Sequence, residues 1–132
     1  MSNARDSATP SAPALCVLLA DDSAVARLAV ARRLRAEGFH VVEGASGDEA
    51  IAHAAETHVA CALLDLDLRD ADGSEIAARL QSTRPDLPIA FFSDPGSRET
   101  AQRARAMGPV FEKPHGLDDA VAWVKQHARG GA

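Results

Sequence analysis

The sequence predicts an α/β fold in which helices cover both faces of a parallel sheet. Two observations support this prediction. Short apolar runs alternate with segments of helical periodicity along the chain, and polar residues follow most of the apolar runs. Short apolar runs are typical of buried strands, and their alternation with helices is typical of a parallel sheet with right-handed crossovers. The expected order of elements is βαβαβαβαβα.

Five apolar runs are the predicted strands. The first could also be the apolar region of a signal peptide, but it is short and leads directly into two aspartates without a cleavage site. The third is almost wholly apolar, as expected for a strand that is buried on both faces. The predicted strands are Leu15–Ala20, Phe39–Val42, Val59–Leu66, Ile89–Phe92 and Val110-Phe111.

Five segments between and after these runs are the predicted helices. In the first, the apolar stripe is expected to be Val25, Leu28, Ala31 and Leu34, the arginines are expected to form a solvated outer face, and Gly38 is expected to end the helix. A capping box, Ser46-Gly47-Asp48-Glu49, is expected to open the second helix, and Asp72-Gly73 is expected to form a turn. The other predicted helices are Ser74–Thr83, Ser97–Met107 and Leu117–Ala128.

Length and composition limit the class of protein. A chain of 132 residues with 46% hydrophobic and 25% charged residues is typical of one soluble domain. We expect a flexible leader over residues 1–13, a domain over residues 14–129 and no membrane insertion. The net charge of −5 argues against direct nucleic-acid binding. Two cysteines, Cys16 and Cys61, are too few for a disulfide scaffold and predict a reducing, cytoplasmic location.

Polar side chains follow four of the five predicted strands, and ligands of parallel sheets bind at this edge. An aspartate at a strand end is more often a turn former or a helix cap, but several carboxylates brought together repel one another unless a cation is present. Oxygen ligands favour Mg²⁺, and a lysine with a hydroxyl suits a phosphoryl group. The residues therefore indicate Mg²⁺-assisted phosphoryl chemistry with an aspartate as nucleophile. They are Asp21, Asp22, Asp65, Asp67, Ser93, Asp94 and Lys113.

The order and spacing of these motifs resemble the receiver domain of two-component response regulators. The matching elements run from about Leu15 to Ala128: the acidic pair after the first strand, Leu63-Leu64-Asp65-Leu66 followed by Asp72-Gly73, the hydroxyl Ser93, and Phe111-Glu112-Lys113-Pro114. The resemblance implies a flavodoxin-like (βα)5 three-layer sandwich with strand order 2-1-3-4-5.

The resemblance also implies roles for individual residues. Asp65 would be the phosphoacceptor. Asp22, helped by Asp21 through water, would hold Mg²⁺ together with the Asp65 carboxylate and the backbone carbonyl of Asp67. Lys113 would pair with a phosphoryl oxygen, Ser93 would hydrogen-bond another, and the Lys113–Pro114 peptide would be cis.

The implied protein is a signalling phosphoacceptor rather than an enzyme. The donor would be a histidine kinase or a histidine phosphotransfer protein. The output would be the docking of an unidentified downstream protein.

Three positions depart from the family pattern. Asp94 stands where a small residue usually follows the strand-four hydroxyl, Arg69 stands where a proline is usual, and Val110 takes the place of the aromatic switch residue. These departures keep open a second interpretation, in which the same fold is a phosphorylation-independent binding module. A third is a phosphatase, because Asp65-Leu66-Asp67 resembles the Asp-x-Asp motif of haloacid-dehalogenase-type enzymes.

Overall fold

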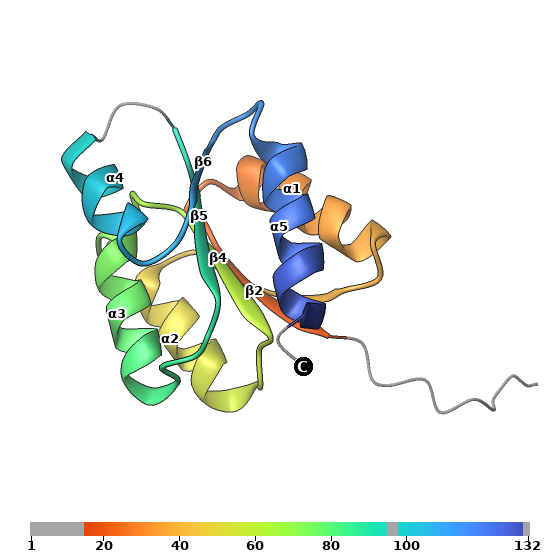
Figure 1. The fold of residues 1–132 in the computed structure, drawn as a ribbon, viewed down its shortest axis with the longest axis horizontal. Helices are drawn as coiled ribbons and strands as arrows, with labels where there is room; N and C mark the ends of the chain where they lie inside the picture. Colours follow the sequence, from red (N-terminus) through yellow and green to blue (C-terminus); the bar gives the residue numbers. More distant parts are fainter. Residues whose placement is uncertain (1–14, 95–97, 131–132) are drawn as a thin grey trace, which may run out of the picture.

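In the computed structural model, residues 15–94 and 98–130 are described, and they contain a five-stranded sheet in which neighbouring strands pair in parallel (Figure 1). The order β3-β2-β4-β5-β6 places β3 at one edge of the sheet and β2 beside it. The predicted fold class and strand order are confirmed. The strands are β2 (Cys16–Ala20), β3 (His40–Gly44), β4 (Cys61–Leu64), β5 (Ile89–Ser93) and β6 (Val110–Glu112).

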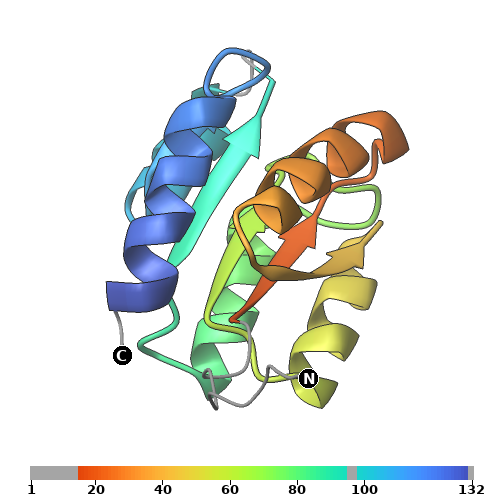
Figure 2. The same ribbon diagram turned by 90° about the vertical axis from the view of Figure 1, so that its right-hand side faces the viewer.

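Helices cover both faces of the sheet, with α1 and α5 on one side and α2, α3 and α4 on the other (Figures 1 and 2). In the part of the chain that is described, no helix is both long and apolar enough to span a bilayer. The helices are α1 (Ala24–Ala36), α2 (Gly47–Glu56), α3 (Gly73–Thr83), α4 (Arg98–Arg105) and α5 (Leu117–Gly130).

Two apolar cores lie on opposite faces of the sheet because successive strand side chains point to opposite sides. In β2, Val17 and Leu19 pack against α1 and α5, whereas Leu18 and Ala20 pack toward α2 and α3. The central strands are buried on both faces, which explains their nearly continuous apolar sequence.

The two cysteines follow the same alternation. Cys61 is buried in the core under α1 and α5, and burial raises the pKa of its thiol to about 12. Cys16 is partly buried on the opposite face of the sheet. The sheet therefore separates the two thiols, and Cys61 behaves as the small apolar residue that its strand position predicts.

The predicted apolar stripe of the first helix is wrong in its first half. Val25 is 82% exposed and Leu28 is 43% exposed, whereas Leu34 is fully buried. Val25 and Leu34 are separated by about 2.5 helical turns, so their side chains leave the helix on opposite sides. The buried face instead contains Val30, Ala31 and Leu34.

Capping also differs in detail from the prediction. Ser46 accepts a hydrogen bond from the Glu49 backbone N–H, as predicted, but the Glu49 carboxylate accepts from the backbone N–H of Ala45 rather than of Ser46. A complete capping box lies at Asp72 and Glu75, where the sequence predicted only a turn. This box fixes the start of α3 directly behind the loop that follows β4.

Several predicted boundaries move by one or two residues. Gly38 has φ +95° and follows the last turn of α1, which confirms it as the stop of that helix. Helix α4 begins at Arg98 and ends at Arg105, so it is shorter at its C-terminus than predicted. Ser97 and the predicted leader over residues 1–13 lie outside the described residues.

Candidate functional site

The predicted site residues meet at the carboxyl edge of the sheet. Asp21 and Asp22 directly follow β2, Asp65 directly follows β4, Ser93 is the last residue of β5, and Lys113 directly follows β6. Backbone hydrogen bonds extend the ladder to these positions: Asp65 N–H donates to the Ala20 carbonyl at 2.8 Å, and Lys113 N–H donates to the Ser93 carbonyl at 2.9 Å. The strand geometry itself therefore converges their side chains.

The Asp65 carboxylate lies at the centre of this group and is buried, with 6% of the residue exposed. Its Oδ1 accepts from Ser93 Oγ at 3.0 Å and from the Asp67 backbone N–H at 3.1 Å. Its Oδ2 lies 3.1 Å from Lys113 Nζ. Three donors from three different segments thus orient one carboxylate.

Lys113 joins Asp65 to the acidic pair. Its Nζ donates to Asp21 Oδ2 at 2.6 Å, and the residue is 9% exposed. Burial alone would lower the pKa of Lys113, but the hydrogen bond to Asp21 and the charges of Asp65 and Asp21 raise the pKa overall. Burial raises the pKa of Asp21 above its ordinary value, against the opposing effects of Lys113 and the Ser23 backbone N–H.

Three carboxylates form a cluster with the spacing of a cation site. Asp21, Asp22 and Asp65 each offer an oxygen, and these oxygens lie within 4.8 Å of one another. One ammonium, that of Lys113, contacts this described cluster. Three carboxylates and one ammonium give a formal charge of −2. Hard oxygen donors with an uncompensated double charge fit a small divalent cation such as Mg²⁺. The Asp67 carboxylate lies outside the cluster, and its backbone faces Asp65 instead.

The loop after β4 is held by contacts on both sides. Asp67 and Asp72 form an antiparallel bridge that closes the loop, and Gly73 N–H donates to the Leu66 carbonyl at 2.8 Å. A Cβ at Gly73 would overlap the Asp65 carbonyl oxygen, so only glycine permits this close approach of α3. Asp70 Oδ1 accepts from the Gly47 N–H at 2.7 Å and anchors the loop to α2.

The three departures from the family pattern occupy different environments. Asp94 is exposed immediately after Ser93, and Arg69 is exposed in the loop after β4. Val110 is partly buried in β6, where it pairs with Phe91. The predicted cis peptide between Lys113 and Pro114 is present.

Two contacts near the site were not predicted from the sequence. Arg27 was assigned to a solvated face, but its side chain is 19% exposed and hydrogen-bonds the Asp21 carbonyl. Its place could have been predicted, because Arg27 stands one turn before Val30 and Ala31 and two turns before Leu34 on the buried face. The ion pair of Arg103 with Asp72, at 2.8 Å, depends on how α4 packs beside α3 and has no local sequence signal.

Comparisons with known proteins agree with this geometry. Residues 17–125 match the response regulator receiver domain family. The chain is 32% identical over 116 residues to a Rickettsia felis protein described as an NtrX-like response regulator, covering 85% of this chain and 24% of that protein. It is 31% identical over 113 residues to the transcriptional regulatory protein PdtaR of Mycobacterium tuberculosis, covering 83% of this chain and 54% of that protein.

Solved structures give the same result. The response regulator receiver protein of Sinorhizobium medicae WSM419 is similar with a TM-score of 0.81 and 26% identity, over 92% of this chain and 100% of that one. The chain spans about a quarter of the length of the Rickettsia felis protein and about half of the length of PdtaR. Because the family match runs from β2 into α5 and includes Asp21, Asp65 and Lys113, the chain belongs to the response regulator receiver domains of two-component signalling systems.

Proposed function

We propose that this receiver domain accepts a phosphoryl group on Asp65 from a phosphohistidine of a histidine kinase or a histidine phosphotransfer protein. The observation that carries the proposal is the setting of the Asp65 carboxylate. It is buried, it is held by Ser93 and Lys113, and it lies beside two further carboxylates. A carboxylate in this setting is a candidate nucleophile for phosphoryl transfer.

In the transfer step, a carboxylate oxygen of Asp65 attacks the phosphorus of the donor. An O–P bond forms, the P–N bond to the donor histidine breaks, and its electron pair returns to the imidazole. The Ser93 hydroxyl and the Asp67 backbone N–H hold Oδ1 of Asp65 and fix the direction of the carboxylate. This fixed direction reduces the entropic cost of the in-line approach.

Lys113 is proposed to stabilise the negative charge of the transferred group. Its ammonium is already placed between Asp21 and Asp65, and its raised pKa keeps it protonated at neutral pH. An ammonium held in place before the reaction can stabilise developing charge without having to reorganise. The Ser93 hydroxyl is proposed to hydrogen-bond a second phosphoryl oxygen.

The acidic cluster is proposed to hold Mg²⁺ through Asp21, Asp22 and Asp65, with the backbone carbonyl of Asp67 as a further ligand. The donor set supports this assignment, because carboxylate oxygens grouped within 4.8 Å leave a formal charge that one ammonium does not balance. Bound Mg²⁺ would neutralise the repulsion between these carboxylates and an incoming phosphoryl group.

The proposed output is the docking of a downstream protein after phosphorylation. Val110 occupies the position of the usual aromatic switch, so the output is proposed to depend on Ser93 and on the loop after β4. That loop is linked to α4 through the Asp72–Arg103 ion pair.

The alternative is a phosphorylation-independent binding module on the same fold. Exposed Asp94 at the edge of the site favours this alternative, since an additional carboxylate disfavours an anionic donor. A phosphatase is disfavoured, because its Asp-x-Asp motif usually ends the first strand, whereas Asp65-Leu66-Asp67 follows β4, the third of the described strands.

Beryllium fluoride, which mimics a phosphoryl group on a carboxylate, separates these possibilities. We expect backbone amide resonances of Ser93 and Lys113 to shift only when beryllium fluoride and Mg²⁺ are both present, and Asp65→Asn to abolish the shift. Asp67→Asn is the matched control and should keep the response. No response in the folded wild type would favour the binding module, and release of phosphate from a phosphate monoester would favour the phosphatase.

A further inference from the structure

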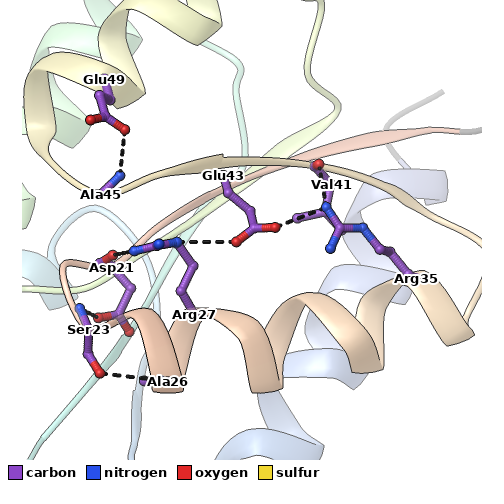
Figure 3. Close-up of polar contacts among 9 residues, drawn as sticks. All are labelled: Asp21, Ser23, Ala26, Arg27, Arg35, Val41, Glu43, Ala45 and Glu49. Atoms are coloured by element: carbon purple, nitrogen blue, oxygen red, sulfur yellow. Dashed lines mark hydrogen bonds and ion pairs between the residues drawn. The ribbon is translucent and has the colours of Figure 1, made fainter.

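Arg27 connects the turn that carries the acidic pair to the edge of the sheet (Figure 3). Its Nη1 donates to the backbone carbonyl of Asp21 at 2.6 Å, and its Nε donates to Glu43 Oε1 on β3 at 3.2 Å. The side chains of Arg27 and Glu43 are 19% and 29% exposed. A single guanidinium, largely shielded from solvent, thus holds two different elements.

The polar atoms of Asp21 are held on every side. Its N–H donates to the Gly44 carbonyl at 3.0 Å, and its carbonyl accepts from Arg27. Its Oδ1 accepts from the Ser23 N–H at 2.9 Å, and its Oδ2 accepts from Lys113 at 2.6 Å. The direction of the Asp21 side chain therefore depends on the position of the turn's backbone as well as on Ser23 and Lys113.

Glu43 keeps Arg27 in place from the other side. Its Oε2 accepts from Arg35 Nη2 at 3.0 Å, and the same Arg35 nitrogen donates to the Val41 carbonyl at 3.1 Å (Figure 3). Glu43 therefore lies between two arginines of α1, and it belongs to the edge strand of the sheet. Within the described part of the chain, Arg27 hydrogen-bonds Asp21, whereas Arg35 does not.

We infer that Arg27 is a positioning residue that holds the turn after β2 so that the Asp21 and Asp22 carboxylates are arranged for a divalent cation before the cation binds. The inference rests on the proposed cation site. Arg27 itself does not touch the cation. It acts through the Asp21 backbone, in the way that groups behind metal ligands commonly set the affinity of a site.

The geometry requires arginine rather than lysine at this position. Two separate nitrogens of one planar guanidinium serve the Asp21 carbonyl and the Glu43 carboxylate at the same time. A lysine presents all of its donors from one nitrogen on a flexible stem, so the same atom would have to approach both acceptors, which the guanidinium reaches with two separate nitrogens held in one plane. Lys at position 27 would keep the charge and lose the geometry.

The test compares Mg²⁺ affinity, measured by calorimetry, with stability to urea in EDTA. We expect Arg27→Gln to weaken Mg²⁺ binding about 10-fold, the lower end of the effect of groups behind metal ligands. Arg27→Lys should weaken it almost as much. Arg35→Gln is the matched control, because it removes the other partner of Glu43 without a contact to Asp21, and it should change Mg²⁺ affinity less than about 2-fold. If Arg27→Gln does not fold, Mg²⁺ affinity is measured in Glu43→Gln instead. This variant keeps both arginines and removes the carboxylate that pairs with Arg27.

The outcomes are distinct. Weaker Mg²⁺ binding in Arg27→Gln and Arg27→Lys, with nearly unchanged binding in Arg35→Gln, supports the inference. Unchanged Mg²⁺ affinity in folded Arg27 variants, or equal losses in the Arg27 and Arg35 variants, would overturn it and leave the proposed function standing. A wild-type chain that does not bind Mg²⁺ would contradict the cation site itself, and the inference with it.

Discussion

Lys113 Nζ lies 2.6 Å from Asp21 Oδ2, across a sequence separation of 92 residues. This buried contact joins the ends of β2 and β6 at the edge of the sheet where Asp65 lies. Burying an ammonium is costly unless carboxylates surround it, and here Asp21 and Asp65 do so. Loss of either partner would leave a buried charge without its counterion, and the same pair holds charge in the proposed phosphorylation site.

Removing Lys113 should destabilise the domain and strengthen its response to Mg²⁺. We expect Lys113→Met to lower the free energy of unfolding in EDTA by about 3 kcal/mol, because it leaves buried carboxylates unpaired. Mg²⁺ should restore more stability to this variant than to the wild type, since no ammonium competes for Asp21. Urea unfolding with EDTA and with Mg²⁺ measures both effects.

Lys125→Met is the control for the loss of one lysine. Lys125 pairs with Glu37 at 3.1 Å, but its side chain is 45% exposed. An exposed pair contributes less than about 1 kcal/mol. Equal losses in the Lys113 and Lys125 variants would contradict the stabilising role of the Lys113–Asp21 contact.

Asp94 is expected to slow phosphorylation by small anionic donors. Its exposed carboxylate directly follows Ser93, a residue that hydrogen-bonds Asp65, so it adds negative charge at the same strand end. We expect Asp94→Ala to raise the rate of phosphorylation by acetyl phosphate several-fold, and we expect added salt to reduce the difference. Asp86→Asn removes an exposed charge from the turn after α3 and should leave the rate unchanged. Equal rates for the wild type and Asp94→Ala at low salt would exclude this gating role.

The orientation of α1 can be tested with two leucines of the same helix. Leu34 is fully buried and Leu28 is 43% exposed. Leu34→Ala should therefore cost about 2–5 kcal/mol in the free energy of unfolding. Leu28→Ala should cost about 1 kcal/mol or less. Similar costs in urea unfolding would show that the helix does not have the orientation described above.

The contribution of Asp70 to stability should depend on pH. Hydrogen bonds from the Gly47 and Asp48 N–H groups lower the pKa of Asp70 below its ordinary value of 3.8. A carboxylate with a lowered pKa stabilises the fold fully above pH 3.8 and loses this effect as the pH falls through the lowered pKa. Wild type should therefore exceed Asp70→Asn in stability at neutral pH, and this excess should shrink below pH 3.8. Urea unfolding of both proteins across this pH range measures the excess stability of the wild type. An excess that grows toward low pH would contradict the prediction.

The site residues could be predicted from the sequence because a parallel sheet brings its strand ends to one edge. Asp21, Asp65, Ser93 and Lys113 each follow or end an apolar run, so the topology alone places them together. No knowledge of helix packing was required. The individual hydrogen bonds, such as the bond from Lys113 to Asp21, were not predicted.

The packing of helices against the sheet and against one another was harder to predict. The stripe from Val25 to Leu34 looked regular, but its spacing of three residues drifts around the helix and hid the inward position of Arg27. The Arg103–Asp72 ion pair depends on how α4 packs beside α3, and no local pattern encodes that packing. Local periodicity therefore predicted the elements well and the orientation of the first helix poorly.

The location of the phosphoryl group is the most direct test of the proposed function. After incubation with acetyl phosphate and Mg²⁺, intact-mass and peptide mass spectrometry should detect one phosphoryl group, on Asp65. The product should be absent in Asp65→Asn and present in Asp67→Asn. A phosphoryl group that persists in Asp65→Asn, or a folded, Mg²⁺-saturated wild type that takes up none from either acetyl phosphate or a phosphohistidine donor, would contradict the account.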